Sequence, residues 1–428
     1  MIDFKIYERD RIMPDDMNAT PRSSRFTIGL FGVRNAGKSS LINALTGQNL
    51  TITSPVAGTT TDPVSKSMEL LPIGPVVFID TAGLDDTGDL GSLRVEKTYE
   101  TLRKCNLAVV VADLGQGITD FEKNFINELK ARKIPAVLTV NKCDSGRPPE
   151  EVRNKLIAEA GIPTAFASAA TGFGIGDVKE LIIKNASYEE AELSLIGDLV
   201  HPGETAVLVV PIDKAAPKGR LILPQQQTIR DLLENDASAI VTKPQELKLT
   251  LANLSQPPAI VITDSQAFLK VSADTPPEIP MTSFSILFAR QKGNLTELVR
   301  GIRRIHDLKP GEKVLIMEGC THHRQSDDIG TVKIPRWIRQ MAGSEIEFEW
   351  CSGASIPKNL KEYAVIVHCG ACMLNRREMQ YRIETAGREG VAITNYGMVI
   401  AYVLGILPRA LKPFPAAAYE LEKVLRRE

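Results

Sequence analysis

Short apolar runs alternate with longer amphipathic stretches along most of the chain. Apolar runs bounded by turn residues predict buried strands, and apolar positions spaced three or four residues apart predict helices. In the first part of the chain this pattern predicts strands at residues 26–31, 76–79, 136–140 and 164–167, with a helix over residues 40–45. Such alternation of strands and helices favours an α/β fold.

The pattern changes near residue 186 and again near residue 259. A small unit with strands at 206–212 and 239–242 and helices at 228–235 and 245–254 has no cluster of reactive side chains, which favours an oligomerising module or a spacer. A second α/β unit follows, with strands at 259–263, 283–288, 313–318, 345–350, 363–367 and 391–394 and helices at 295–305 and 376–387. We therefore expect an extension (1–24) and three domains (25–185, 186–258 and 259–428).

A phosphate-binding loop, Gly-Val-Arg-Asn-Ala-Gly-Lys-Ser, occupies residues 32–39 directly after the first expected strand. In such loops the backbone N–H groups face phosphates, the lysine lies against the β and γ phosphates, and the serine hydroxyl binds Mg²⁺. A second box, Asp80-Thr-Ala-Gly83, ends the next strand. Its aspartate reaches Mg²⁺ through water and its glycine amide senses the γ phosphate.

Guanine specificity is expected from Asn141-Lys142-Cys143-Asp144, which ends a further strand. The Asp144 carboxylate can accept hydrogen bonds from both N1 and N2 of guanine, which adenine does not offer. Ser168-Ala169 resembles the last guanine-contacting element of GTPases. The candidate GTP contacts are Gly32, Asn35, Ala36, Gly37, Lys38, Ser39, Ser40, Asn141, Lys142, Asp144, Ser168 and Ala169.

Between these boxes, Gly58-Thr-Thr-Thr-Asp62 resembles the first switch of translation-factor-like GTPases, which implies that Thr60 senses Mg²⁺. The expected Mg²⁺ ligands are Ser39, Thr60 and Asp80, and the expected catalytic residues are Lys38, Thr60, Asp80 and Gly83. Leu84 stands where Ras-type proteins have a water-positioning glutamine, so slow intrinsic hydrolysis is expected. Asn35 inside the phosphate loop looks like the arrangement of K⁺-stimulated GTPases, although a turn residue is the alternative interpretation.

A candidate metal site joins Cys320-Thr-His322 to His368-Cys369-Gly-Ala-Cys372. One alternative is zinc bound by three cysteines and a histidine. The other is an iron-sulfur cluster held by Cys320, Cys369 and Cys372, whose fourth iron takes an oxygen, nitrogen or exchangeable ligand. Asp327 is the first candidate for that fourth ligand, and the others are His322, His323, His368, Asp328 and Cys351.

Composition is that of a globular multidomain protein, with 43% hydrophobic and 24% charged residues among 428. The net charge of -1 gives no reason to expect a nucleic-acid surface. The six cysteines are expected to stay reduced in the cytoplasm. No membrane span is expected, because the longest apolar run (397–407) ends at Pro408, short of the ~20 residues a bilayer needs. Residues 1–16 are either an extension or precede a start at Met17.

Four segments resemble the FeFe-hydrogenase maturation GTPase, the HydF family. They begin at Met281, Cys320, His368 and Thr394, and the likeness extends from about residue 17 to the carboxyl terminus. The resemblance implies a GTPase domain, a dimerisation domain and a 4Fe-4S cluster domain. It also implies a homodimeric scaffold that carries the two-iron subcluster, with radical-SAM maturases and apo FeFe-hydrogenase as partners. The GTPase boxes add GTP and Mg²⁺ as expected cofactors, and Asn35 adds K⁺.

A second interpretation remains open, in which the chain is a ribosome- or tRNA-directed GTPase with a structural zinc domain. The switch residues favour it, and the lack of a basic stretch with interleaved aromatics speaks against it.

Overall fold

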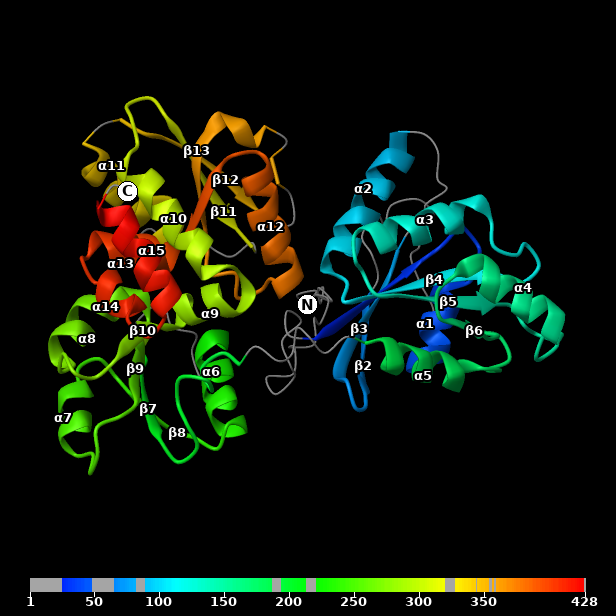
Figure 1. Ribbon diagram of the computed structural model, residues 1–428, viewed down its shortest axis with the longest axis horizontal. Coiled ribbons are helices and arrows are strands. Elements are labelled where there is room, and N and C mark those ends of the chain that lie inside the picture. Colours follow the sequence, from blue (N-terminus) through cyan, green and yellow to red (C-terminus); the bar gives the residue numbers. More distant parts are fainter. Residues whose placement is uncertain are drawn as a thin grey trace, which may run out of the picture.

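The computed structural model describes residues 25–47, 65–81, 89–186, 194–212, 221–319, 328–343, 345–353, 356–357 and 359–426. Within these ranges the chain forms three separate β-sheets, each covered by helices (Figure 1). The predicted α/β class is confirmed.

The first domain is built on a six-stranded sheet in the order β2-β3-β1-β4-β5-β6, in which β2 is antiparallel and the others are parallel. The apolar strands lie in the middle because helices α1 and α5 cover one face and α2, α3 and α4 cover the other. The strands are Phe26–Phe31 (β1), Ser65–Leu70 (β2), Gly74–Asp80 (β3), Leu107–Asp113 (β4), Ala136–Asn141 (β5) and Thr164–Phe166 (β6). The helices are Lys38–Thr46 (α1), Asp89–Lys104 (α2), Asp120–Ala131 (α3), Glu150–Ala160 (α4) and Ile175–Asn185 (α5).

The second sheet has four parallel strands in the order β10-β9-β7-β8. They are Thr205–Val209 (β7), Ser238–Thr242 (β8), Ile260–Thr263 (β9) and Met281–Ser283 (β10), with helices Leu223–Glu234 (α6), Leu247–Ala252 (α7), Phe268–Asp274 (α8) and Phe284–Lys292 (α9). Because β9 and β10 belong to this sheet, the expected domain boundary at 258/259 is wrong, and the boundary falls after α9.

The strand predicted at 283–288 is also wrong, because Phe284–Lys292 is helical. The Ser283 hydroxyl caps this helix by accepting a hydrogen bond from the Ile286 amide at 3.2 Å. A short apolar run can be either a buried strand or a buried helix, and here the N-cap at Ser283 favours the helix.

The third sheet is also parallel, in the order β12-β11-β13-β14. Its strands are Lys313–Glu318 (β11), Glu347–Ser352 (β12), Tyr363–His368 (β13) and Ala392–Asn395 (β14). Its helices are Leu295–His306 (α10), Ile334–Ala342 (α11), Arg376–Arg388 (α12), Tyr396–Val403 (α13), Leu407–Leu411 (α14) and Pro415–Arg426 (α15). The predicted buried helix is confirmed as α13.

One continuous apolar core joins the second and third sheets, whereas the first domain has cores of its own. In the described ranges, no helix is both long and apolar enough to cross a membrane.

Candidate nucleotide and metal sites

The phosphate-binding loop connects β1 to α1 and has the backbone that its sequence predicts. Asn35 and Gly37 adopt left-handed conformations, with φ of 63° and 92°. A Cβ at Gly37 would lie 2.3 Å from Asn141 Nδ2, so only glycine fits there. Lys38 is buried, and its ammonium donates to the carbonyls of Gly32 and Val33 at 2.9 Å each. The loop is therefore folded around the lysine that the motif assigns to phosphate.

Asp80 lies at the end of β3, next to the start of α1. The Ser39 hydroxyl donates to one carboxylate oxygen of Asp80. The other oxygen, Oδ1, is buried without a hydrogen-bond partner among the described residues. Burial raises the pKa of Asp80, while Ser39 and Lys38 act in the opposite direction. A half-buried carboxylate with a spare oxygen beside a serine hydroxyl fits a Mg²⁺ ion and its water.

The guanine side of the site is held together by Asn141, the last residue of β5. Its Nδ2 donates to the Ala36 carbonyl and its Oδ1 accepts from the Ala169 amide, both at 3.0 Å. The Ser168 hydroxyl donates to Asp144 Oδ1 at 2.5 Å. The two segments that sequence assigned to guanine are therefore in direct contact. Thr60, Gly83 and Leu84 lie outside the described residues.

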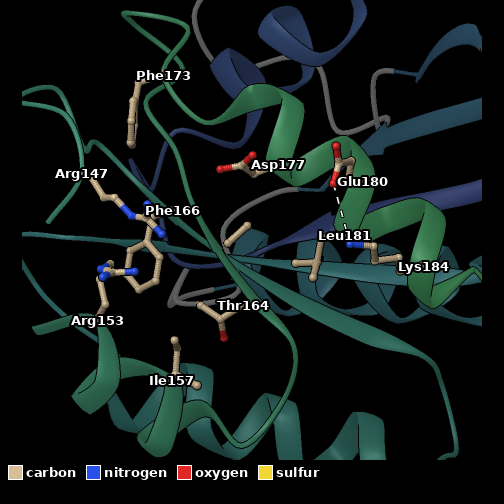
Figure 2. Close-up of a pocket in the computed structure, with 11 residues that line it drawn as sticks. Arg147, Arg153, Ile157, Thr164, Phe166, Phe173, Asp177, Glu180, Leu181 and Lys184 are labelled. Atoms are coloured by element: carbon tan, nitrogen blue, oxygen red, sulfur yellow. Dashed lines mark ion pairs between the residues drawn. The ribbon is translucent and has the colours of Figure 1, made fainter. Parts of the chain in front are cut away.

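A separate pocket of about 270 Å³ opens between α4, β6 and α5 (Figure 2). Arg147 and Arg153 lie beside the Phe166 ring on one side, and Asp177 lies on the other (Figure 2). None of the residues that line this pocket belongs to the phosphate loop or to the guanine boxes. It is therefore not the nucleotide site.

The candidate metal site lies at the carboxyl ends of the neighbouring parallel strands β11 and β13. The Cys369 amide donates to the Met317 carbonyl at 2.8 Å, and the Gly319 amide donates to Cys369 Sγ at 3.1 Å. Ala371 turns the loop with φ of 53°, and Cys369 and Cys372 are both partly buried. The strand order therefore brings Gly319, the residue before Cys320 in sequence, to the loop that carries Cys369 and Cys372. Cys320, His322, His323 and Asp327 lie outside the described residues.

His368 is fully buried, and both of its ring nitrogens are engaged. Nδ1 lies 2.8 Å from the Cys369 carbonyl, so it carries the proton, and Nε2 accepts from Arg382 Nη1 at 3.0 Å. Burial, together with the Arg382 charge, lowers the pKa of His368 to about 3. In this arrangement neither nitrogen is available to a metal, which corrects the expectation that His368 is a candidate fourth ligand. Its role here is to orient the cysteine loop.

Lys292, at the end of α9, was not singled out from the sequence. Its buried ammonium donates to the carbonyls of Ala371 and Cys372 at 3.2 Å and of Leu374 at 2.8 Å. Burial lowers the pKa of Lys292 to about 8, and Cys372 and Cys369 oppose that shift. A positive charge beneath the loop would offset the negative charge of thiolates. Nothing in the sequence around residue 292 signals this contact, because it depends on the packing of two domains.

Cys351 lies on β12, in register with Met317 of β11. Burial raises the pKa of Cys351 to about 11, so its thiol is protonated in the absence of a metal. Cys105 and Cys143 are buried in the first domain, as expected for inert thiols.

The fold and these sites define a class of protein in which a P-loop GTPase domain is joined to two α/β domains, the last of which carries a cysteine loop. Residues 27–142 match the model of the 50S ribosome-binding GTPase family. Residues 195–293 match the hydrogen maturase F dimerization domain, and residues 296–413 match the hydrogen maturase F tetramerization domain. The two maturase models together cover just over half of the chain, and the chain belongs to the hydrogen maturase F (HydF) family. It joins a GTPase-type domain to two domains that match the dimerization and tetramerization domains of that family.

Relatives among curated proteins include the tRNA modification GTPase MnmE of Nitrosomonas europaea, 33% identical over 162 residues, or 37% of this chain and 34% of MnmE. GTPase Der of Wolinella succinogenes is 32% identical over 169 residues, or 38% of this chain and 36% of Der. The chain thus spans about a third of the length of these relatives.

Two solved structures are also similar to this chain. The G domain of the T. maritima FeoB iron transporter is 25% identical and covers 38% of this chain and 99% of its own length, with a TM-score of 0.31. Aquifex aeolicus Era is 18% identical and covers 58% of this chain and 99% of its own length, with a TM-score of 0.34.

Proposed function

We propose that this chain is a GTP-hydrolysing scaffold that binds a 4Fe-4S cluster through Cys320, Cys369 and Cys372. The scaffold assembles the two-iron subcluster precursor and delivers it to apo FeFe-hydrogenase. The observation that carries the proposal is the hydrogen bond from the Gly319 amide to Cys369 Sγ, next to Cys320, in a chain of the maturase family.

The surroundings of the loop fit an anionic cluster. Amide N–H groups that donate to cysteine sulfur, such as Gly319 N–H, stabilise thiolates and tune cluster potentials. Lys292 places a buried cation behind the same loop. A bound cluster would supply an iron atom with an exchangeable ligand, to which the two-iron cargo can attach. The chain's own residues hold the three thiolates, orient the loop through His368 and offset its charge.

The fourth ligand is assigned to Asp327, with His322 and His323 as alternatives. Asp327 immediately precedes Asp328, whose carboxylate accepts from the Thr331 amide at 2.9 Å and caps the turn Ile329–Lys333. A carboxylate binds iron more weakly than a fourth thiolate, which suits a site that must accept and release cargo.

GTP is bound and hydrolysed in the first domain. Lys38 contacts the β and γ phosphates, Ser39 and Thr60 bind Mg²⁺, and Asp80 reaches it through water. Asp144 selects guanine, and the Gly83 amide senses the γ phosphate. K⁺ at Asn35 supplies the positive charge that an arginine finger supplies elsewhere, and Leu84 keeps intrinsic hydrolysis slow.

The test is the metal content of anaerobically purified protein. Iron and sulfide in equal amounts, with the electron paramagnetic resonance spectrum of a reduced 4Fe-4S cluster, are expected for the wild type and should be lost in Cys320→Ala, Cys369→Ala and Cys372→Ala. Zinc alone would overturn the proposal and favour a ribosome- or tRNA-directed GTPase instead. That alternative agrees with the family matched by the first domain, the 50S ribosome-binding GTPases.

The fourth ligand is tested separately. Asp327→Ala should keep the iron but change the spectrum and make exchange with added imidazole easier. An unchanged spectrum would transfer the role to a histidine, Cys351 or a small molecule.

A further inference from the structure

Helix α12 starts directly after the cysteine loop and lies on the side of the third domain that faces the GTPase domain (Figure 1). There it contacts α2. Its N-cap, Asn375, is three residues beyond Cys372 and makes two hydrogen bonds. Asn375 Oδ1 accepts from the Glu378 amide at 3.0 Å, which caps α12. Asn375 Nδ2 donates to the Lys104 carbonyl at 2.7 Å, at the end of α2. One side chain therefore joins the end of the cysteine loop to the GTPase domain.

Two consecutive residues of α12, Tyr381 and Arg382, contact the GTPase domain and the cysteine-loop side of the third domain, respectively. The Arg103 guanidinium of α2 lies over the Tyr381 ring, 4.4 Å from its centroid, in a cation–π contact. The next residue, Arg382, points about 100° away around the helix and is fully buried. Its guanidinium donates to His368 Nε2, next to Cys369 in sequence. A displacement of α12 must therefore move both its contact with Arg103 in the GTPase domain and its contact with His368 beside the cysteine loop.

Helix α2 is the element of the GTPase domain from which a nucleotide signal is expected. It begins at Asp89, in the segment that follows the Asp80 box. In GTPases this segment is ordered by contacts to the γ phosphate and released on hydrolysis. Arg103 and Lys104, which contact α12, are the last two residues of α2.

The described side chains do not fill all the space between α2 and α12. A cavity of about 780 Å³ lies beside it, lined by Tyr99, Arg103 and Arg132 from the GTPase domain and by Arg377, Tyr381 and Glu384 from α12. Because close packing is missing over this area, surrounding side chains do not compensate for the loss of a specific contact such as Asn375–Lys104 or Arg103–Tyr381. Single substitutions should therefore uncouple the domains without unfolding either.

We propose that α12 couples the nucleotide state of the GTPase domain to the conformation of the cysteine loop, through Asn375 to Lys104 and Tyr381 to Arg103. This inference rests on the proposed function for its biological meaning, because the loop is where the cluster binds. By thermodynamic reciprocity, if the nucleotide changes the affinity of the loop for the cluster by some factor, the bound cluster must change nucleotide affinity by the same factor.

Asn375→Asp separates coupling from capping. Aspartate is as good an N-cap as asparagine, so the bond from the Glu378 amide is kept. The carboxylate cannot donate to the Lys104 carbonyl, so the contact with α2 is lost. The chain offers a matched control, Asn294→Asp, because Asn294 caps α10 by accepting from the Glu297 amide at 3.2 Å in the same Asn-x-x-Glu pattern. Arg103→Ala is the second uncoupling variant.

The first measurement uses full-length protein without cluster. Hydrogen exchange of residues 369–374 is compared with GDP and with a non-hydrolysable GTP analogue. In the wild type and in Asn294→Asp, we expect the exchange rates with GDP and with the GTP analogue to differ at least about fivefold. A factor of about five is the lower end of the usual range of allosteric couplings. The difference should vanish in Asn375→Asp and Arg103→Ala. Equal exchange with both nucleotides in the wild type would overturn the coupling.

The second measurement compares the affinity for the GTP analogue in cluster-loaded and cluster-free protein. A coupling at the lower end of the usual allosteric range predicts a ratio of at least about five in the wild type and about one in the two uncoupling variants. A ratio of five that persists in Asn375→Asp and Arg103→Ala would refute these residues as the connection. Protein that binds no cluster but shows nucleotide-dependent exchange would instead contradict the proposed function and leave the coupling standing.

Discussion

Arg382→Met should destabilise the third domain more than any surface substitution on the same helix. The guanidinium is fully buried, and Nε lies 3.1 Å from Glu378 Oε1 in an ion pair. Nη1 donates to His368 Nε2 at 3.0 Å, and Nη2 donates to the Gly353 carbonyl at 2.5 Å. Methionine fills most of the same volume but makes none of these bonds. Glu378, whose second oxygen already lacks a partner among the described residues, would become an unpaired buried carboxylate.

Removing one partner of a buried ion pair costs about 3–5 kcal/mol, because the remaining charge stays desolvated. The total stability of a domain is only about 5–15 kcal/mol. With an m-value of about 2 kcal/mol/M, the urea midpoint should fall by about 1.5–2.5 M. The cysteine loop should also become more mobile, because His368 Nε2 loses the hydrogen bond from Arg382.

The assay can exclude the GTPase domain in the full-length protein. The chain has two tryptophans, Trp337 and Trp350, and both lie in the third domain. Tryptophan fluorescence during urea unfolding therefore reports on the third domain and the core it shares with the second, and not on the GTPase domain. The matched control is Arg388→Met on the same helix, where an exposed guanidinium lies 3.5 Å from Glu384. That exposed pair should contribute less than about 1 kcal/mol.

A loss of less than about 1 kcal/mol in Arg382→Met would refute this account of the buried network. The double variant Arg382→Met/Glu378→Met gives an independent check. It removes both charges, so it should be at least about 1 kcal/mol more stable than the single variant, although the bonds to His368 and to the Gly353 carbonyl are still missing. A double variant that is less stable than the single one would show that packing, and not the unpaired charge, sets the cost.

Three predictions concern the nucleotide site. Lys38→Ala should lower GTP turnover at least about 100-fold and leave the iron content unchanged, and lost iron would show that the sites depend on one another. Asp144→Asn removes a charged acceptor of two guanine hydrogen bonds, so GTP binding should weaken about 100-fold in a nucleotide titration; a retained preference for GTP over other purine nucleotides would contradict the assignment. Replacing K⁺ by Na⁺ should lower turnover if Asn35 helps to hold the ion, and equal rates in both salts would remove that assignment.

The GTPase half could be predicted closely because its motifs are local. Each box occupies a strand end, and the run of apolar residues before it identifies the strand. The structure confirms strands at Phe26–Phe31 and Ala136–Asn141, and it brings Asn141 into contact with Ala36 and Ala169. The second half was less predictable. The run at 283–288 is apolar throughout, and periodicity alone does not distinguish a buried strand from a buried helix.

The candidate metal site shows where sequence reasoning ends. The cysteines could be identified because thiols in close spacing are rare, and because parallel strands end at one edge of a sheet. Lys292 and Arg382 could not be identified, because lysine and arginine are common and their side chains usually face solvent. Their roles depend on burial, of Lys292 against Leu374, which is 82 positions away, and of Arg382 against His368, which is 14 positions away. Removing His368 from the candidate ligands likewise required the position of Arg382.

The contact between the two domains was beyond prediction for a more specific reason. Asn294-Leu-Thr-Glu297 and Asn375-Arg-Arg-Glu378 have the same capping pattern, and both cap a helix in the structure. The local capping pattern therefore predicts the hydrogen bond that each asparagine Oδ1 accepts, and it predicts no partner for the Nδ2 group. The Nδ2 group of Asn375 meets the Lys104 carbonyl only because α12 packs against α2. A sequence pattern of four residues contains no information about an acceptor that lies 271 positions away in the chain. Such a contact between domains becomes visible only in the folded structure, and it is the contact on which the proposed coupling depends.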